Sequence, residues 1–253
     1  ITGMASGAIN YFATGGTFKG GVNIAAGTAG DTISIESLRD DTLTVVMGND
    51  GDDTVTVNAG VTTGKLEVLG EGGKDTVDAS AVPAGAQLTL IGGLGEDTLT
   101  GGAGRDVIFG DMAVITRDSD YIITKAESAQ PDQGSNDVLQ GNGGGDFILG
   151  GYGDDTLYGN DGSDTIIGDN GLFQYNVTGN LTKIVSADSA VGGADTIDAG
   201  DGDNAVIGGF GADTITGGSG VDVMVGDNGS VEFTAGVVTL MESTDADDTT
   251  GGN

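Results

Sequence analysis

The chain has 253 residues, a formal net charge of -31 and 51 glycines, but only 7 Phe, 5 Tyr and no Trp. So few large side chains make an ordinary globular core hard to assemble, and so much negative charge makes a compact state repel itself unless cations bind. The charge argues against nucleic acid and anionic membranes as partners. The absence of Cys and His excludes thiolate metal sites, zinc-protease motifs and Ser-His-Asp catalysis within these residues.

No apolar run is long enough to span a bilayer, so we expect no membrane insertion. No signal-peptide pattern opens the chain, and the last residues stop in the middle of a repeating pattern, so we expect a fragment of a longer repeat protein.

In the N-terminal third, aliphatic residues follow aspartates at uneven intervals, as in Asp31-Thr32-Ile33, Asp41-Thr42-Leu43, Asp53-Thr54-Val55 and Asp75-Thr76-Val77. Acidic chains of low hydrophobicity are often disordered, but disorder does not require aliphatic residues at fixed distances after Asp. We expect residues 1–91 to form an irregular β-solenoid with degenerate repeats, recognisable from about residue 27. For residues 1–26 the sequence predicts no fold.

From Gly92 onward the nonapeptide G-G-x-G-x-D-x-U-x recurs, where U is aliphatic. Close copies lie at residues 92–100, 101–109, 141–149, 150–158, 159–167, 208–216 and 217–225, with looser ones at 48–56, 70–78 and 199–207. Internal repetition of this length predicts a solenoid. Glycines allow positive φ and turn carbonyls toward one point, the Asp adds a carboxylate, and hard oxygen ligands in that number suit calcium.

The residues after each Asp are extended, so the U residue points inward. We expect the whole core to be one row of U residues: Val55, Val77, Leu99, Ile108, Ile148, Leu157, Ile166, Val206, Ile215 and Met224.

These repeats resemble the repeats-in-toxin (RTX, haemolysin-type) family of calcium-binding nonapeptides, most clearly over residues 92–228. The resemblance implies a parallel β-roll with two nonapeptides per coil and calcium between stacked turns. It implies the following ligands: Asp53, Asp97, Asp106, Asp146, Asp155, Asp164, Asn204, Asp213 and Asp222. Asn204 lacks the charge and should give a weaker site, and Lys74 beside Asp75 opposes a cation. The alternative is a glycine-rich β-structure without metal; EF-hand loops fit poorly, because the Asp118–Asp120 segment lacks the loop glycine and terminal Glu.

Corresponding glycines at 92, 150 and 208 are 58 residues apart, so a larger repeat overlies the nonapeptide. Between nonapeptides, three segments have two extended runs around a turn, which predicts β-hairpins at about 111–136, 169–194 and 227–250. We therefore expect residues 92–253 to form an all-β parallel β-roll or β-solenoid with protruding hairpins on one side, which could pair into one sheet. Leu94, Tyr152 and Phe210 should lie beneath them, rather than form a ligand-binding stripe. Ordinary and expanded turns would alternate on that side, so calcium sites should be denser on the other.

The function expected is that of a non-catalytic, calcium-binding structural region of a bacterial surface-layer, filament or adhesin protein, exported by type I secretion to the cell surface and rigidified by calcium. Self-association through the hairpins and the solenoid ends is expected, because exposed strand edges favour pairing. The alternative is a non-catalytic folding and secretion module of an exported enzyme or toxin. An ice- or polysaccharide-binding face is less favoured, because outward positions mix Thr, Ile, Tyr and Phe.

Overall fold

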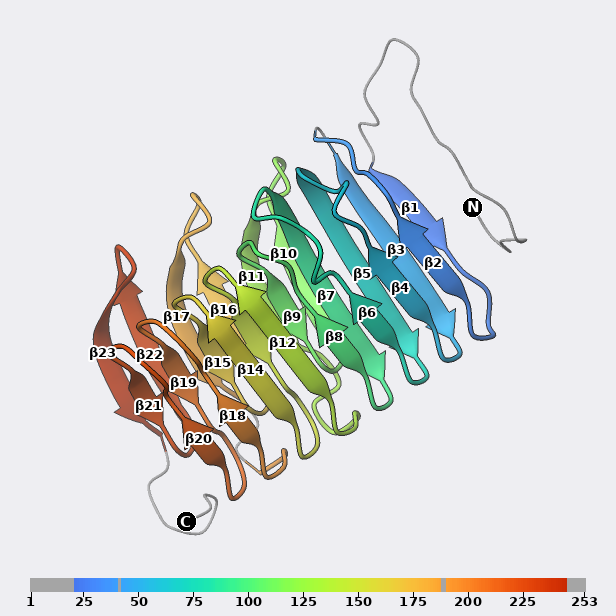
Figure 1. Ribbon diagram of the computed structural model, residues 1–253. Helices are drawn as coiled ribbons and strands as arrows, with labels where there is room; N and C mark the ends of the chain where they lie inside the picture. The colour runs from blue at the N-terminus through green and yellow to red at the C-terminus, as the bar shows by residue number, and fades with distance from the viewer. Residues whose placement is uncertain (1–20, 41, 188–189, 245–253) are drawn as a thin grey trace.

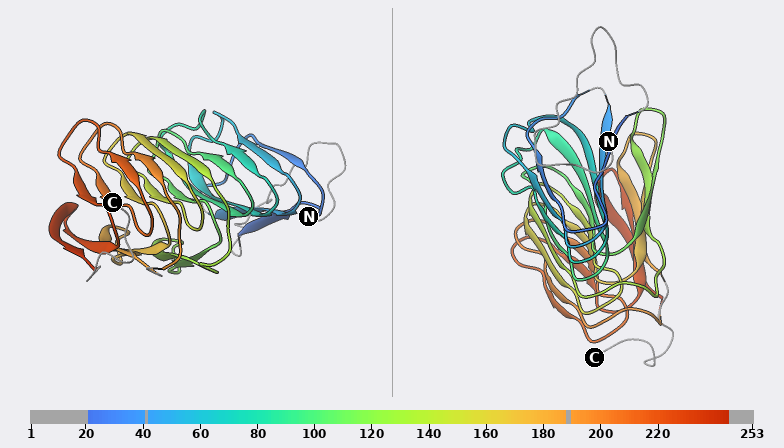
Figure 2. Two further views of the ribbon diagram at one scale, coloured as in Figure 1. Left: turned by 90° about the horizontal axis from the view of Figure 1, so that it is seen from below. Right: turned by 90° about the vertical axis from the view of Figure 1, so that its right-hand side faces the viewer.

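The computed structural model describes residues 21–40, 42–187 and 190–244, which form a stack of coils with a third layer of hairpins along one flank (Figures 1 and 2). Residues 1–20 and the end of the third predicted hairpin, beyond residue 244, lie outside the described part. Within that part no helix is long and apolar enough to cross a membrane.

Each coil contributes one strand to each of two parallel sheets. The nine-stranded sheet contains, in order, β1 (Val22–Ala25), β3 (Leu43–Asp50), β5 (Gly64–Gly72), β7 (Ala86–Leu94), β9 (Val107–Phe109), β13 (Phe147–Leu149), β15 (Thr165–Ile167), β19 (Ala205–Ile207) and β21 (Val223–Val225). The eight-stranded sheet contains β2 (Thr32–Ile35), β4 (Thr54–Val57), β6 (Thr76–Asp78), β8 (Thr98–Thr100), β12 (Val138–Gly143), β14 (Thr156–Asp161), β18 (Thr196–Asp198) and β20 (Thr214–Thr216). The predicted parallel β-solenoid is confirmed.

The aspartates of the N-terminal part look unevenly spaced in the sequence because successive Asp-x-aliphatic units do not all belong to the same sheet. Asp31, Asp53, Asp75 and Asp97 all precede strands of the eight-stranded sheet and follow one another at 22 residues. The strands pair in the same 22-residue register, so that Val55 lies beside Val77 and Val77 beside Leu99. The coils of the N-terminal part therefore continue directly into those of the nonapeptide region.

The predicted inward row forms the core between the two parallel sheets. Val55, Val77, Leu99, Ile108, Ile148, Leu157, Ile166 and Val206 are at most 3% exposed, and Ile215 is partly buried against them. Met224 is the exception at 46% exposure, because its strand β21 is the last of the nine-stranded sheet among the described residues. The strands that follow the hairpins add Leu139 and Ile197 to the same row.

The hairpins pair edge to edge into one antiparallel sheet, ordered β10 (Ala113–Arg117), β11 (Ile123–Ser128), β16 (Gly171–Tyr175), β17 (Leu181–Ser186), β22 (Gly229–Thr234) and β23 (Val237–Ser243). Between hairpins, Ala126 pairs with Phe173 and Ile184 with Val231. The expectation that successive hairpins join into one sheet is confirmed.

This hairpin sheet does not protrude; it lies against the outer face of the nine-stranded sheet and encloses a second core (Figure 2). Phe173 packs between Phe109 and Phe147, with ring centroids 5.9 and 5.7 Å away, and Tyr175 meets Phe147 at 5.3 Å. The expectation of a single-row core is therefore wrong. Most residues on either side of the U positions in the nine-stranded sheet from β7 onward are apolar, such as Val107, Phe109 and Leu149, and they belong to this second core.

The expected contact of Leu94, Tyr152 and Phe210 with the hairpins is also wrong. Leu94 and Tyr152 are 39% exposed, and none of the three belongs to the second core. Tyr152 and Phe210 lie in turns and Leu94 at the end of β7, whereas the hairpin sheet covers the nine-stranded sheet where Val107, Leu149 and Ile207 are buried.

Candidate calcium-binding turns

The aspartates at the end of each turn stack into two columns. The hairpin-side column lies on turns that lead from the nine-stranded to the eight-stranded sheet and contains Asp31, Asp53, Asp75, Asp97, Asp137, Asp155, Asp195 and Asp213. The opposite column contains Asp106, Asp146, Asp164, Asn204 and Asp222. In both, a backbone N–H donates to Oδ1 of the next residue of the column, as from Asp97 to Asp137 at 2.7 Å.

The second carboxylate oxygen of nearly every member of the columns is buried without a hydrogen-bond partner. This holds for Oδ2 of Asp53, Asp75, Asp97, Asp137, Asp146, Asp155, Asp164, Asp195 and Asp213, and for Oδ1 of Asp106. A buried, unsatisfied polar atom typically costs about 1–3 kcal/mol, and more when it is charged. So many orphaned oxygens in one repeated position indicate a missing cationic partner.

The first glycine of each repeat leaves room beside that orphaned oxygen. A Cβ on Gly92 would lie 2.3 Å from Asp97 Oδ2 and 2.3 Å from the carbonyl oxygen of Gly110 on the next coil. At Gly141 the corresponding distances, to Asp146 Oδ2 and the Gly159 carbonyl, are 2.3 and 2.9 Å. A carboxylate oxygen and a carbonyl oxygen from neighbouring coils thus face a common point, and a side chain there would fill it.

Oxygen donors of this kind fit calcium, which takes 6–8 hard oxygen ligands from carboxylates and carbonyls. Among the described residues no three carboxylates gather closely enough to hold an ion by themselves, so backbone carbonyls would supply most of the ligands.

Burial makes the charged form of these carboxylates costly. It raises the pKa of Asp97 to about 8, of Asp146 to about 8 and of Asp164 to about 6. Burial followed by the charges of Asp195 and Asp137 raises the pKa of Asp155 well above its usual value. At neutral pH Asp97 and Asp146 therefore need either a proton or a nearby cation.

Asn204 shows what occupies such a turn when the carboxylate is replaced. Its Nδ2 donates to the carbonyl oxygens of Gly200, Gly202 and Gly217, at 3.4, 3.3 and 3.2 Å. Three carbonyls thus converge on one positively polarised group in a turn of the opposite column. The amide fills the position that a cation would take, which gives a physical reason for the weaker site expected there.

Replacing Asn204 with Asp should restore a calcium site. Asn204→Asp removes the amide donor and adds a carboxylate toward the same three carbonyls, so the variant should bind one calcium ion more per chain than the unaltered protein, measured by titration calorimetry and metal analysis. Asn23→Asp, the same charge change at an exposed position of β1, should leave the number unchanged. Equal calcium content of Asn204→Asp and the unaltered chain would contradict this interpretation.

All nine predicted ligand residues lie in the two columns: Asp53, Asp97, Asp155 and Asp213 on the hairpin side, and Asp106, Asp146, Asp164, Asn204 and Asp222 opposite. The structure adds Asp75, which lies in a looser copy but was set aside because of Lys74, and Asp31, Asp137 and Asp195, which the contiguous nonapeptide pattern did not select. Each is followed by an extended residue and then an aliphatic one, and this shorter signal would have identified them.

The premise that expanded turns interrupt the hairpin-side column is wrong. Asp137 and Asp195 follow the hairpins and take the same place in the column as Asp155. Lys74 does not point at the Asp75 carboxylate either, because its Nζ pairs with Glu96 at 3.1 Å on the surface. The hairpin-side column is therefore the longer one.

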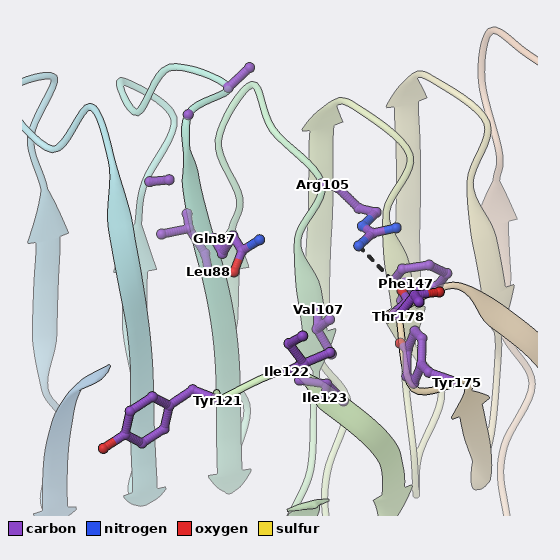
Figure 3. A pocket seen from close by; sticks show the side chains of 14 residues that line it. Gln87, Leu88, Arg105, Val107, Tyr121, Ile122, Ile123, Phe147, Tyr175 and Thr178 are labelled. Atoms are coloured by element: carbon purple, nitrogen blue, oxygen red, sulfur yellow. Dashed lines mark hydrogen bonds between the residues drawn. The ribbon is translucent and has the colours of Figure 1, made fainter. Parts of the chain in front are cut away.

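A cavity of about 320 Å³ between the nine-stranded sheet and the hairpin turns is not a calcium site (Figure 3). Arg105 lies over the Phe147 ring, 5.6 Å from its centroid, and donates to the Gly179 carbonyl at 3.5 Å. Phe147, Tyr175 and Thr178 lie at the same end of the cavity, and Tyr121 at the other. The lining carries the positive charge of Arg105 and no carboxylate, so it does not suit a cation. Its aromatic side chains pack the hairpins against the nine-stranded sheet.

The geometry thus defines a parallel β-roll with stacked Asp and glycine-carbonyl turns of the calcium-binding type. The model of the RTX calcium-binding nonapeptide repeat matches the chain at residues 45–61, 89–112, 140–171, 189–214 and 198–230. The protein belongs to this repeat family, as the nonapeptide pattern predicts. RTX repeats bind calcium and are typical of bacterial proteins exported by type I secretion. A search among curated proteins finds no match.

Proposed function

We propose that this β-roll is a calcium-dependent structural region of an exported bacterial surface, filament or adhesin protein, which folds and becomes rigid only when calcium fills its turns. The observation that carries the proposal is the repeated orphaned carboxylate oxygen, as on Asp97, Asp146 and Asp155. A chain with 39 acidic and 8 basic residues must neutralise these buried carboxylates before its coils can stack.

The coupling of folding to calcium binding also suits export from the cell. A chain that is unfolded where calcium is scarce can pass through a secretion channel and fold outside, where calcium is plentiful. The metal supplies charge neutralisation, and the chain's own coils supply the stacked carbonyls and the aliphatic row. No paired acid and base is distinguishable within the repeated carboxylates, so we propose a non-catalytic role for these residues.

Calcium, but not magnesium, should restore the fold of the metal-stripped chain. Magnesium requires near-ideal octahedral geometry and gives up its water reluctantly, whereas calcium accepts irregular oxygen cages of carbonyls and carboxylates. We expect far-ultraviolet circular dichroism of the stripped chain at neutral pH to change to a β spectrum on calcium addition and to remain unchanged with equal magnesium. A full β spectrum in chelator at neutral pH would refute the proposed function.

The alternative is the same calcium-folded module attached to an exported enzyme or toxin. Calcium folding is common to both contexts, so the readout that separates them is the rest of the polypeptide: further coils favour the structural role, and a catalytic domain favours the alternative.

We also propose that the folded rods associate with one another through the C-terminal coil. The inner face of the hairpin sheet is already covered, since Phe173, Ile184 and Val231 are fully buried within the chain. Exposed apolar side chains gather instead on the last described coil and on β23, where Val221 is 74% and Met241 49% exposed. Strands β20, β21 and β23 are the last of their sheets among the described residues, and a strand edge that no further coil covers pairs readily.

A lysine at this end should weaken self-association. Met224→Lys places a charge on the half-exposed end of the apolar row and should shift calcium-loaded protein toward the monomer in sedimentation velocity. Val177→Lys is the control, because Val177 is 84% exposed but lies in a hairpin turn. If both variants sediment like the unaltered chain at every concentration, the C-terminal coil is not the contact.

A further inference from the structure

The two complete hairpins are inserted into turns of the hairpin-side column and split each turn into two parts. The ordinary turn at residues 150–155 reads Gly-Gly-Tyr-Gly-Asp-Asp. The first split turn has Gly110-Asp111 before the hairpin and Gly-Ser-Asn-Asp, residues 134–137, after it. The second has Gly168-Asp169 before and Gly-Gly-Ala-Asp, residues 192–195, after it. Neither is a contiguous nonapeptide.

In space each split turn is reassembled into the shape of an ordinary one. A Cβ on Gly153 would lie 2.6 Å from the Ser135 carbonyl oxygen, and one on Gly211 only 1.7 Å from the Gly193 carbonyl oxygen. The Asp154 N–H donates to Asn136 Oδ1 at 3.0 Å. The segments that follow the hairpins therefore stack in the same column as the ordinary turns.

The orphaned oxygens of the split turns come from the far end of each hairpin. A Cβ on Gly110 would lie 2.2 Å from Asp137 Oδ2 and 2.5 Å from the Gly150 carbonyl oxygen. Asp137 and Asp195 are both 1% exposed, and their Oδ2 atoms have no hydrogen-bond partner. The near end provides the open point beside Gly110, while the carbonyl oxygen of Gly110 itself faces Asp97 Oδ2 at the preceding point of the column, beside Gly92.

An additional carboxylate stands at each split turn, where ordinary turns have their second glycine. Asp111 accepts the Ser135 N–H at 3.3 Å from the returning end of its hairpin, and the Tyr152 N–H from the next coil. Asp169 repeats the arrangement, accepting the N–H of Gly193 at 2.8 Å and that of Phe210. Both side chains are thus held at the base of a hairpin.

These extra carboxylates add negative charge close to the column. Burial, and then the charge of Asp111, raises the pKa of Asp137 to about 9. Burial, and then the charge of Asp195, raises the pKa of Asp169 to about 9. More negative charge around an oxygen cage tightens calcium binding.

Building on the proposed function, we propose that both split turns are calcium sites, in which the far end of a hairpin supplies the carboxylate and the near end supplies the glycine beside which the ion binds, so that the ion closes the hairpin base. At the first hairpin, Asp137 Oδ2 and the Gly150 carbonyl of the next coil face the point beside Gly110. At the second, Asp195 Oδ2 and the Gly208 carbonyl face the point beside Gly168, and Asp111 and Asp169 strengthen the two sites by their charge. Docking of the hairpin sheet onto the nine-stranded sheet is then a calcium-dependent step, which neutralisation of the ordinary turns alone does not complete.

The test compares the double variant Asp137→Asn and Asp195→Asn with Asp146→Asn, which alters an ordinary turn of the opposite column. Metal analysis should show two fewer calcium ions in the double variant and one fewer in the control. Hydrogen exchange of the hairpin strands at 171–175 and 181–186 should be at least roughly tenfold faster in the double variant, with β14 still protected. An unchanged calcium content, or hairpins as protected as in the control, would overturn the inference.

A second measurement uses the unaltered chain and does not depend on the variants folding. During a calcium titration, the hairpin amides should gain protection only as calcium binds; hairpins protected in chelator would overturn the inference. The two proposals fail in different ways. If the unaltered chain is fully folded without calcium, the proposed function fails. If it folds only with calcium but the double variant keeps its ions and hairpin protection, the inference alone fails.

Discussion

The metal-stripped chain is expected to lack β structure at about pH 8 and to regain much of it at about pH 5, because protons can replace calcium on the buried columns. Burial raises the folded-state pKa of Asp75 to about 6, of Asp106 to about 7 and of Asp195 to about 8, from an ordinary value of 3.8. A group whose pKa is raised by folding binds its proton more tightly in the folded state. The metal-free fold therefore gains stability as pH falls through 9 to 6 and levels off near 4.

The size of the effect follows from the number of groups that titrate together. Burial raises the pKa of ten column aspartates: Asp53, Asp75, Asp97, Asp106, Asp137, Asp146, Asp155, Asp164, Asp195 and Asp213. A single unit at five of them, Asp97, Asp106, Asp137, Asp146 and Asp195, whose pKa values rise to between about 7 and 9, corresponds to about 7 kcal/mol, which is comparable to the whole stability of an ordinary domain, about 5–15 kcal/mol. Charge neutralisation is thus large enough to decide between folded and unfolded chains.

Circular dichroism of metal-stripped protein between about pH 4 and 9, compared with calcium-saturated protein, measures this directly. The calcium-saturated chain should keep its β spectrum at the alkaline end, because the ion neutralises the same oxygens. A metal-free spectrum that does not change with pH, or that loses β structure on mild acidification, would contradict the interpretation of the columns.

Gly162→Ala should cause the largest loss of stability among single methyl additions to the turns. Gly162 has φ +145° and a Cβ there would lie 1.3 Å from the Gly144 carbonyl oxygen, while a Cβ on Gly202 would lie 1.6 Å from the Gly162 carbonyl oxygen. The methyl must push two coils apart and thereby break the Asp146–Asp164 hydrogen bond in the opposite column. Positive φ and steric overlap together should cost about 3–5 kcal/mol, which lowers the melting temperature by roughly 10 °C.

Gly226→Ala is the matched control, because nothing lies within 4 Å of a Cβ at Gly226 and its φ is not in the left-handed region. Thermal melts of both variants in saturating calcium should separate clearly, with Gly226→Ala close to the unaltered chain. Equal melting temperatures would mean that the coils can move apart without loss, and would refute the role given to the glycine column.

The parts that could be predicted from the sequence are those that recur at a fixed distance. Leu157 and Asp155 stand in the same relation as Leu99 and Asp97, so the core row and the ordinary turns were visible. Asp137 and Asp195 could not be predicted as ligands from a contiguous nonapeptide, because the glycines that complete their turns, Gly110 and Gly168, precede a hairpin.

The second core was missed for a different reason. Three-residue strands such as β9 and β13 place one side chain inward and two outward, and an outward side chain in a solenoid is normally solvated. Phe109 and Phe147 are outward yet buried, because a hairpin lies over them. The available signal was the contrast between the two sheets: apolar residues flank the U position in β9 and β13, whereas Thr flanks it on both sides in β8 and β20.

The columns also restrict how such a rod can change its length. Consecutive aspartates of the hairpin-side column are 22, 18 or 40 residues apart, each interval being one full coil, with the longest including a hairpin. Gain or loss of one or two residues inside an ordinary turn would move the carboxylate of that turn out of its column, whereas whole coils can be added or removed, in pairs where the hairpins follow every second coil. Length therefore changes in increments of whole coils. Small insertions and deletions are confined to segments that no column crosses: the hairpin turns, where Val177 stands in solvent, and the loops after β4 and β6, whose coils have 22 residues rather than 18.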